Sequence, residues 1–134
     1  MKKLLAVTSL VFIILAIIPS CKKDNGPFVG TWRKVITAGD TANFKATDNS
    51  NFQYSSSTGA GISDQGSGDY SYTGSQLTFT FRADASGNNC IGTPGVYSYV
   101  INGNTLNLTV ATDVCTNSSS VPRYFAVNGN WLRQ

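Results

Sequence analysis

The sequence predicts an all-β protein, an antiparallel up-and-down meander that closes as a small eight-stranded barrel after an N-terminal signal segment. Short apolar runs alternate with polar residues at a period of two, and tight turn pairs such as Asn-Gly separate them. Strong helix formers are scarce beyond the first 20 residues. A meander of eight or nine strands must curl, and closure into a barrel removes its exposed edges.

Five strand candidates occupy the first half of the folded part. In the fifth, Leu77, Phe79 and Phe81 fall on one face, and Thr78 and Thr80 fall on the other, as in a strand with one buried face. A Gly-Ser pair directly before it fits a two-residue turn. The candidate strands are residues 28–37, 40–46, 52–54, 69–73 and 76–82.

The second half repeats this pattern. Leu106, Leu108 and Val110 share one face of a strand that follows Asn102-Gly103, a strong hairpin signal. Another Asn-Gly pair precedes the final strand. The candidate strands here are residues 95–101, 104–111, 123–127 and 130–133.

Three stretches lack a strand pattern. Residues 55–68 are rich in Ser and Gly and predict a flexible, low-complexity segment. Residues 83–94 and 115–122 predict two further loops, each of which contains one cysteine.

The composition excludes several kinds of chemistry. The chain has no His, and all seven of its acidic residues are Asp, so neither catalysis by His nor a zinc site built on imidazole is possible. From residue 21 onward, eight Lys or Arg and seven Asp leave a net charge of +1. This charge is too small to indicate a surface that binds nucleic acid. We therefore expect no enzyme, no catalytic residues, no cofactor, no metal site and no nucleic-acid partner.

The N-terminus is predicted to be a targeting signal. Two lysines precede the mainly apolar residues 4–18, a run too short for a membrane span of about 20 residues. The small residue before Cys21 resembles the lipobox of bacterial lipoproteins, in the looser form usual in Bacteroidetes. This resemblance implies a signal peptide over residues 1–20, and a tether over residues 21–27 that begins at a lipidated Cys21. An ordinary cleaved signal and an uncleaved anchor helix are the alternatives.

The lipobox also implies a location. Acyl chains such as palmitate on Cys21 would give stable membrane anchoring, because each buried CH₂ contributes about 0.8 kcal/mol. We expect the protein in the bacterial cell envelope, at the outer membrane, with both the periplasmic-facing and the surface-facing orientation open.

The three cysteines are predicted to have two different roles, one as a lipid attachment site and two as a disulfide. With Cys21 assigned to the lipid, Cys90 and Cys115 form an even pair in an oxidising compartment, which predicts a disulfide. It would close a loop of about 25 residues and stabilise the fold by roughly 3.5 kcal/mol.

Gly30-Thr31-Trp32 resembles the G-x-W signature of lipocalins. The later strand at 103–108, the Cys-bearing loop, an Arg and a final Trp strand are similar to small bacterial lipocalin-like domains, and this resemblance covers residues 28–134. It implies a barrel in which a late Arg packs over Trp32 and closes one end, a cation–π contact of about 1–2 kcal/mol. Arg123 matches best by position, with Arg133 as the rival.

Two hypotheses for function follow. In the first, a small apolar ligand binds in the barrel, among Phe79, Phe81, Leu106, Leu108 and Val110. In the second, these side chains fill the barrel, and the protein is a structural or interaction module of the envelope. Its Ser/Gly segment or a set of outward-facing tyrosines would then meet a partner protein or a glycan; we place on the outer surface Tyr70, Tyr72, Tyr97 and Tyr99.

One modification site is also indicated. Asp40-Thr41-Ala42 resembles the O-glycosylation motif of Bacteroidetes periplasmic proteins, and the resemblance implies a glycan on Thr41.

Overall fold

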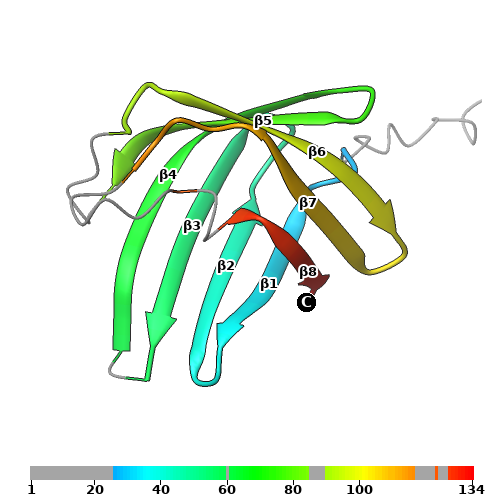
Figure 1. Ribbon diagram of the computed structural model, residues 1–134. Helices are drawn as coiled ribbons and strands as arrows, with labels where there is room; N and C mark the ends of the chain where they lie inside the picture. The colour runs from blue at the N-terminus through cyan, green and yellow to red at the C-terminus, as the bar shows by residue number, and fades with distance from the viewer. Residues whose placement is uncertain (1–25, 60, 85–89, 117–122, 124–126) are drawn as a thin grey trace, which may run out of the picture.

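The protein is an all-β barrel of eight antiparallel strands, as predicted (Figure 1). The computed structural model describes residues 26–59, 61–84, 90–116, 123 and 127–134. The strands are β1 (Gly30–Thr37), β2 (Asp40–Ala46), β3 (Asn51–Thr58), β4 (Gly61–Thr73), β5 (Gln76–Asp84), β6 (Pro94–Asn102), β7 (Thr105–Thr112) and β8 (Gly129–Arg133).

Each strand pairs with the next along the chain, and β8 returns to pair with β1, which closes the barrel. In Figure 1, β1 to β4 lie side by side, and the yellow and orange strands β6 and β7 cross above them. An eight-stranded antiparallel barrel of this kind fits a lipocalin-like fold.

The up-and-down order gives the barrel two different ends. Residues 26–29 and the turns after β2, β4 and β6 lie at one end, which we call the turn end. The turns after β1 and β3 and the longer connections after β5 and β7 lie at the other, which we call the loop end.

The strands form because apolar residues recur at every second position. In β2, Ala42, Phe44 and Ala46 are buried, whereas Asn43 and Lys45 between them point outward. The same alternation places Leu77, Phe79 and Phe81 of β5 inside. The core of the protein is therefore the interior of the barrel.

The prediction of a flexible segment at residues 55–68 is wrong. Residues 55–58 form the second half of β3 and residues 61–68 the first part of β4, and the two strands pair in register with Ser55 opposite Gln65 and Gln53 opposite Ser67. Backbone hydrogen bonds hold the hairpin, and they do not depend on side-chain hydrophobicity. A Ser- and Gly-rich composition is thus compatible with a strand whose partners supply the core.

Two glycines in this hairpin make room for aromatic rings. A Cβ atom on Gly66 would lie 2.8 Å from Cε1 of Phe81, and one on Gly68 would lie 2.9 Å from Cε1 of Phe52. Glycine at these inward-facing positions therefore serves packing, where close approach forbids a side chain.

Other boundaries agree more closely. Gly103 has a φ of 55°, which fits the tight turn expected between β6 and β7. The strand expected at residues 123–127 falls largely outside the described residues, and Arg123 itself lies in a turn. Among the described residues the barrel thus has eight strands rather than nine.

Candidate functional site

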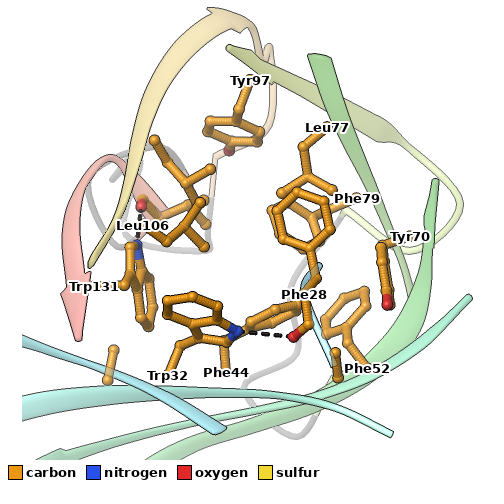
Figure 2. Close-up of a cluster of buried hydrophobic side chains, with 14 of the residues drawn as sticks. Phe28, Trp32, Phe44, Phe52, Tyr70, Leu77, Phe79, Tyr97, Leu106 and Trp131 are labelled. Atoms are coloured by element: carbon orange, nitrogen blue, oxygen red, sulfur yellow. Dashed lines mark hydrogen bonds between the residues drawn. The ribbon is translucent and has the colours of Figure 1, made fainter. Parts of the chain in front are cut away.

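The barrel interior is filled by large side chains (Figure 2). Four phenylalanines from β2, β3 and β5 pack against one another with ring centroids 5.0–5.6 Å apart, three of the ring pairs edge-on and one tilted. Phe79, Phe81, Leu106 and Leu108, which we expected in the lumen, are buried there, and Val110 is half-buried against them. The predicted lumen residues thus share one interior.

Little space remains between these side chains. The interior hollow has a volume of about 10 Å³ and is entirely apolar at its surface. Sites for drug-sized ligands typically enclose about 300–1,000 Å³. The hollow is bounded by Phe44, Phe52, Tyr54, Phe79, Phe81, Leu108, Val127 and Trp131.

The prediction of outward-facing tyrosines is wrong. Tyr70 and Tyr97 are buried, and Tyr72 and Tyr99 are half-buried against the core. Each tyrosine occupies a strand position whose side chain faces the interior. Three of the hydroxyls donate hydrogen bonds: Tyr70 to the Asp48 carbonyl, Tyr97 to the Asp113 carboxylate and Tyr99 to the Gly74 carbonyl. Burial is the main cause that raises the pKa of Tyr70 to about 12.

The arginine that covers Trp32 is Arg133, so the predicted pairing with Arg123 is wrong. The Arg133 guanidinium lies 4.4 Å from the centroid of the Trp32 ring, and the two residues face each other across β1 and β8. Arg133 also donates to the Pro27 carbonyl at 2.6 Å, while Trp32 Nε1 donates to the Phe28 carbonyl at 2.8 Å. Together these contacts close the turn end.

A second tryptophan repeats this arrangement. Trp131 Nε1 donates to the carbonyl four residues earlier, that of Val127, at 2.8 Å. Its ring centroid lies 5.9 Å from Nζ of Lys34. The two contacts are reciprocal. The strand that carries Trp32 supplies Lys34, two residues later, to the Trp131 ring. The strand that carries Trp131 supplies Arg133, two residues later, to the Trp32 ring.

Arg123 instead makes a buried ion pair at the loop end. Its Nε and Nη2 donate to the two oxygens of Asp113 at 2.8 Å each, and Nη1 donates to the Thr93 carbonyl at 3.1 Å. The Arg123 and Asp113 side chains are 4% and 0% exposed. Tyr97 donates to the same carboxylate, and burial, followed by this hydrogen bond, raises the pKa of Tyr97.

The cysteine pair lies beside this ion pair. Cys90 and Cys115 have Cα atoms 5.6 Å apart, within the range of a disulfide, and the bridge connects the segments that follow β5 and β7. The Cys115 N–H also donates to Asp113 at 3.1 Å. The predicted pairing therefore has the geometry it requires.

A polar groove lies on the outer face of β1 to β4. Its volume is about 760 Å³. Two rows of side chains cross neighbouring strands here: Thr31, Lys45, Gln53 and Ser67 face one another in register, and Asn43, Ser55 and Gln65 form the next row. The groove is lined by Thr31, Asn43, Lys45, Gln53, Tyr54, Ser55, Gln65, Gly66, Ser67 and Ala83.

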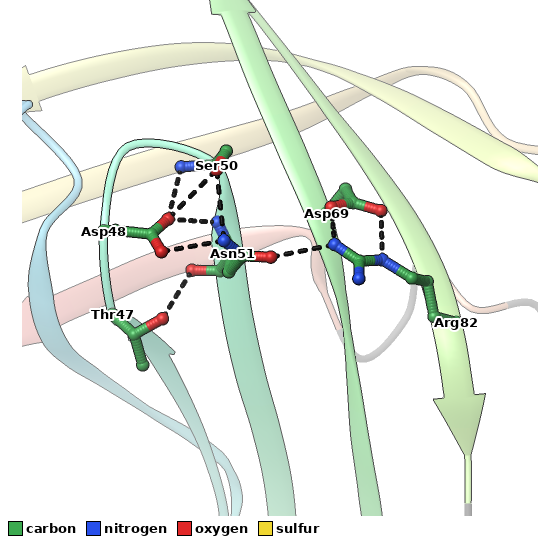
Figure 3. Close-up of polar contacts among 6 residues, drawn as sticks. All are labelled: Thr47, Asp48, Ser50, Asn51, Asp69 and Arg82. Carbon is green, nitrogen blue, oxygen red and sulfur yellow. Dashed lines mark hydrogen bonds and ion pairs between the residues drawn. The ribbon is translucent and has the colours of Figure 1, made fainter.

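The carboxylates beside this groove are already engaged (Figure 3). Asp48 accepts from the backbone of Ser50 and Asn51 and from the side chains of both. These bonds, chiefly that from the Ser50 backbone, lower the pKa of Asp48 to about 2. Asp69 forms an ion pair with Arg82.

Thr41 lies on the outer face of β2. It is half-buried, and its hydroxyl shares a 2.8 Å hydrogen bond with that of Ser57 on β3. Asp40 and Ala42 flank it within the strand, so the motif sits in regular sheet rather than in a loop.

The lipidation site falls outside what the structure describes. Cys21 and residues 1–25 precede the described residues. No helix among the described residues is long and apolar enough to cross a membrane. In the same residues, no three acidic or cysteine side chains gather as metal ligands.

Sequence reasoning missed two features. The groove was missed because residues 55–68 were interpreted as flexible, although Gln53, Ser55, Gln65 and Ser67 alternate as outward strand positions would. The pairing of Asp113 with Arg123 was missed because a single Asp near a cysteine carries no recognisable spacing.

Comparison with known proteins adds no relative. A scan against protein-family models, a search of curated proteins and a search of solved structures each found no match to this chain.

Proposed function

We propose that this protein is a lipid-anchored, non-catalytic interaction module of a bacterial cell envelope, with a filled barrel and an outer surface that meets its partner. The observation that carries the proposal is a difference in volume: the hollow inside the barrel has about 10 Å³, whereas the outer polar groove has about 760 Å³. A small apolar ligand in the barrel is disfavoured, because it would have to displace packed aromatic rings.

The position of the chain entry supports an oriented anchor. The Gly26 N–H donates to Asn49 at 2.6 Å and the Pro27 carbonyl accepts from Arg133, so both residues are held at the turn end. From Cys21 to Gly26 the chain spans at most about 18 Å. A lipid on Cys21 would therefore hold the turn end near the membrane and leave the barrel wall and the loop end accessible.

Lipid labelling tests the anchor. Bacteria that express the full chain are fed an alkyne-bearing palmitate analogue, and the protein is isolated and its N-terminus analysed by mass spectrometry. We expect label on Cys21 and none in the Cys21→Ser variant, which also should leave the membrane fraction. An unlabelled native protein would overturn the anchor.

Organic extraction tests the filled barrel. Protein purified from its host is extracted with chloroform and methanol, and the extract is compared with that of an unrelated lipoprotein by mass spectrometry. We expect no stoichiometric small molecule in the extract, because acyl chains on Cys21 are bound covalently and stay with the protein. Recovery of about one equivalent of an apolar compound would favour the ligand carrier instead.

A further inference from the structure

We propose that the outer groove of β1 to β4 binds an acidic oligosaccharide, one built from uronic acid units. The inference deepens the proposed function and rests on it, because it names the site and the ligand class through which the module would act. Three observations carry it: the side-chain chemistry of the groove, its charge and its shape.

The side chains of the groove can both donate and accept hydrogen bonds. Asn43, Gln53 and Gln65 present carboxamides, and Ser55 and Ser67 present hydroxyls. Among the described residues, none of these five side chains hydrogen-bonds to another group of the protein. Sugar hydroxyls have the same dual character, so a saccharide would match groups that otherwise face water.

The charge of the groove is positive. Lys45 lines it, and Arg33, which is exposed, extends the second row opposite Asn43. Among the described residues no carboxylate lines the groove; of the two carboxylates beside it, Asp69 is neutralised by Arg82, and Asp48 is the one that keeps its negative charge. An anionic sugar is thereby favoured over a neutral one.

The shape fits a short chain of sugars. Four adjacent strands span about 14 Å from the first to the last. Register shifts interrupt the ladders of this wall between Val35 and Thr37 and between Ser56 and Ser57, and a third lies at its edge with β5, between Ser67 and Gly68. Such irregularities bend a strand and change its local twist, so this wall is not a flat sheet.

Isothermal titration of the full chain in detergent tests the proposal with matched sugars. The acidic probes are trimers of galacturonate, mannuronate and guluronate, and the neutral control is galactotriose of the same linkage as the galacturonate trimer, in which a hydroxymethyl group replaces each carboxylate. We expect binding of at least one acidic trimer, at least about tenfold tighter than galactotriose. Equal binding of the acidic and neutral sugars would overturn the ligand class, and no binding of any trimer would overturn the site.

Variants locate the binding. Lys45→Gln removes the charge at similar length, and Gln53→Ala removes one carboxamide; we expect each to weaken the acidic trimer about tenfold. Gln76→Ala is the matched control, because Gln76 is exposed on β5 and does not line the groove. Unchanged binding in both groove variants would overturn the site.

The outcome is separable from that of the proposed function. Labelling of Cys21 and extraction of the barrel report on the anchor and the interior, and neither measurement depends on sugar. A labelled protein with an empty extract that binds no acidic trimer would overturn this inference alone.

Discussion

The two ends of the barrel are closed by different means. At the turn end the connections are short, and Phe28 packs its ring against Tyr70, Tyr72 and Tyr99, with centroids 4.8–5.9 Å apart. Arg133 covers Trp32 at the same end. At the loop end, the longer connections are held by a disulfide and by the buried pair of Arg123 and Asp113.

The difference follows from the length of the connections. A two-residue turn fixes its own backbone, so aromatic packing is enough to seal that end. A long connection loses more conformational entropy on folding than a two-residue turn does. Covalent and ionic links therefore hold the loop end.

The largest expected effect is the loss of the buried ion pair. Arg123→Ala would leave the Asp113 carboxylate buried without its main partner, and we expect the free energy of unfolding to fall by about 3–5 kcal/mol in urea titrations. The double variant Arg123→Met/Asp113→Leu should recover only part of this loss, because Asp113→Leu also leaves the Tyr97 hydroxyl and the Cys115 N–H without their acceptor. A loss below about 1 kcal/mol would contradict the role of this pair at the loop end.

Removal of the disulfide should come next. The double variant Cys90→Ser/Cys115→Ser removes a link between residues 25 positions apart. We expect the free energy of unfolding to fall by about 3.5 kcal/mol. A reductant should destabilise the native protein similarly and leave this variant unchanged. Equal sensitivity of both proteins to the reductant would show that the bridge does not act as described.

A smaller effect is expected at Gly95. A Cβ atom there would lie 2.6 Å from Oδ2 of Asp113 and 2.5 Å from Nη2 of Arg123. Gly95→Ala should therefore push the pair apart and cost about 1–3 kcal/mol. Unchanged Arg123–Asp113 distances in a crystal structure of the variant would show that contact with this pair is not the reason for glycine at position 95.

Loss of one charge should destabilise the turn end less than it destabilises the loop end. Arg133→Met removes the cation over Trp32 and the bond to Pro27, and we expect a loss of about 1 kcal/mol because Arg133 is exposed. Its matched control is Arg82→Met, which alters an exposed ion pair away from any tryptophan. Equal effects of the two substitutions would argue against the stacking.

Acid should weaken the turn end through Asp48. Because folding lowers the pKa of Asp48 to about 2, its contribution is present above pH 4 and is lost as the pH falls from about 4 to 2. Thermal unfolding between pH 2 and 5 should therefore show a flatter profile for Asp48→Asn than for the native chain. Parallel profiles would exclude the turn as the acid-sensitive element.

Alternation made the barrel predictable from sequence. The period of two in residues such as Leu106 and Leu108 defines which side chains face inward, and it depends only on strand geometry. The same rule, applied to Tyr70 and Tyr97, would have placed them inside. Their polar hydroxyls suggested the surface, but buried carbonyl and carboxylate partners satisfy them.

Other features depend on contacts that spacing does not encode. Arg133 rather than Arg123 covers Trp32 because the β1–β8 register places it directly opposite, and that register is known only once the barrel closes. The groove likewise needs the β2–β3 and β3–β4 registers, which bring Lys45, Gln53 and Ser67 into one row.

The seam between β1 and β8 has a consequence for how the barrel assembles. In the described strands its ladder pairs only two positions, and the Arg133–Pro27 bond links residues 106 apart in the chain. Contacts so distant in the chain carry a high loop-closure cost, and a large share of them slows folding. Until the seam closes, β1 and β8 are both free edges that can pair with another copy, so the crossed tryptophan–cation contacts also guard against exchange of strands between molecules.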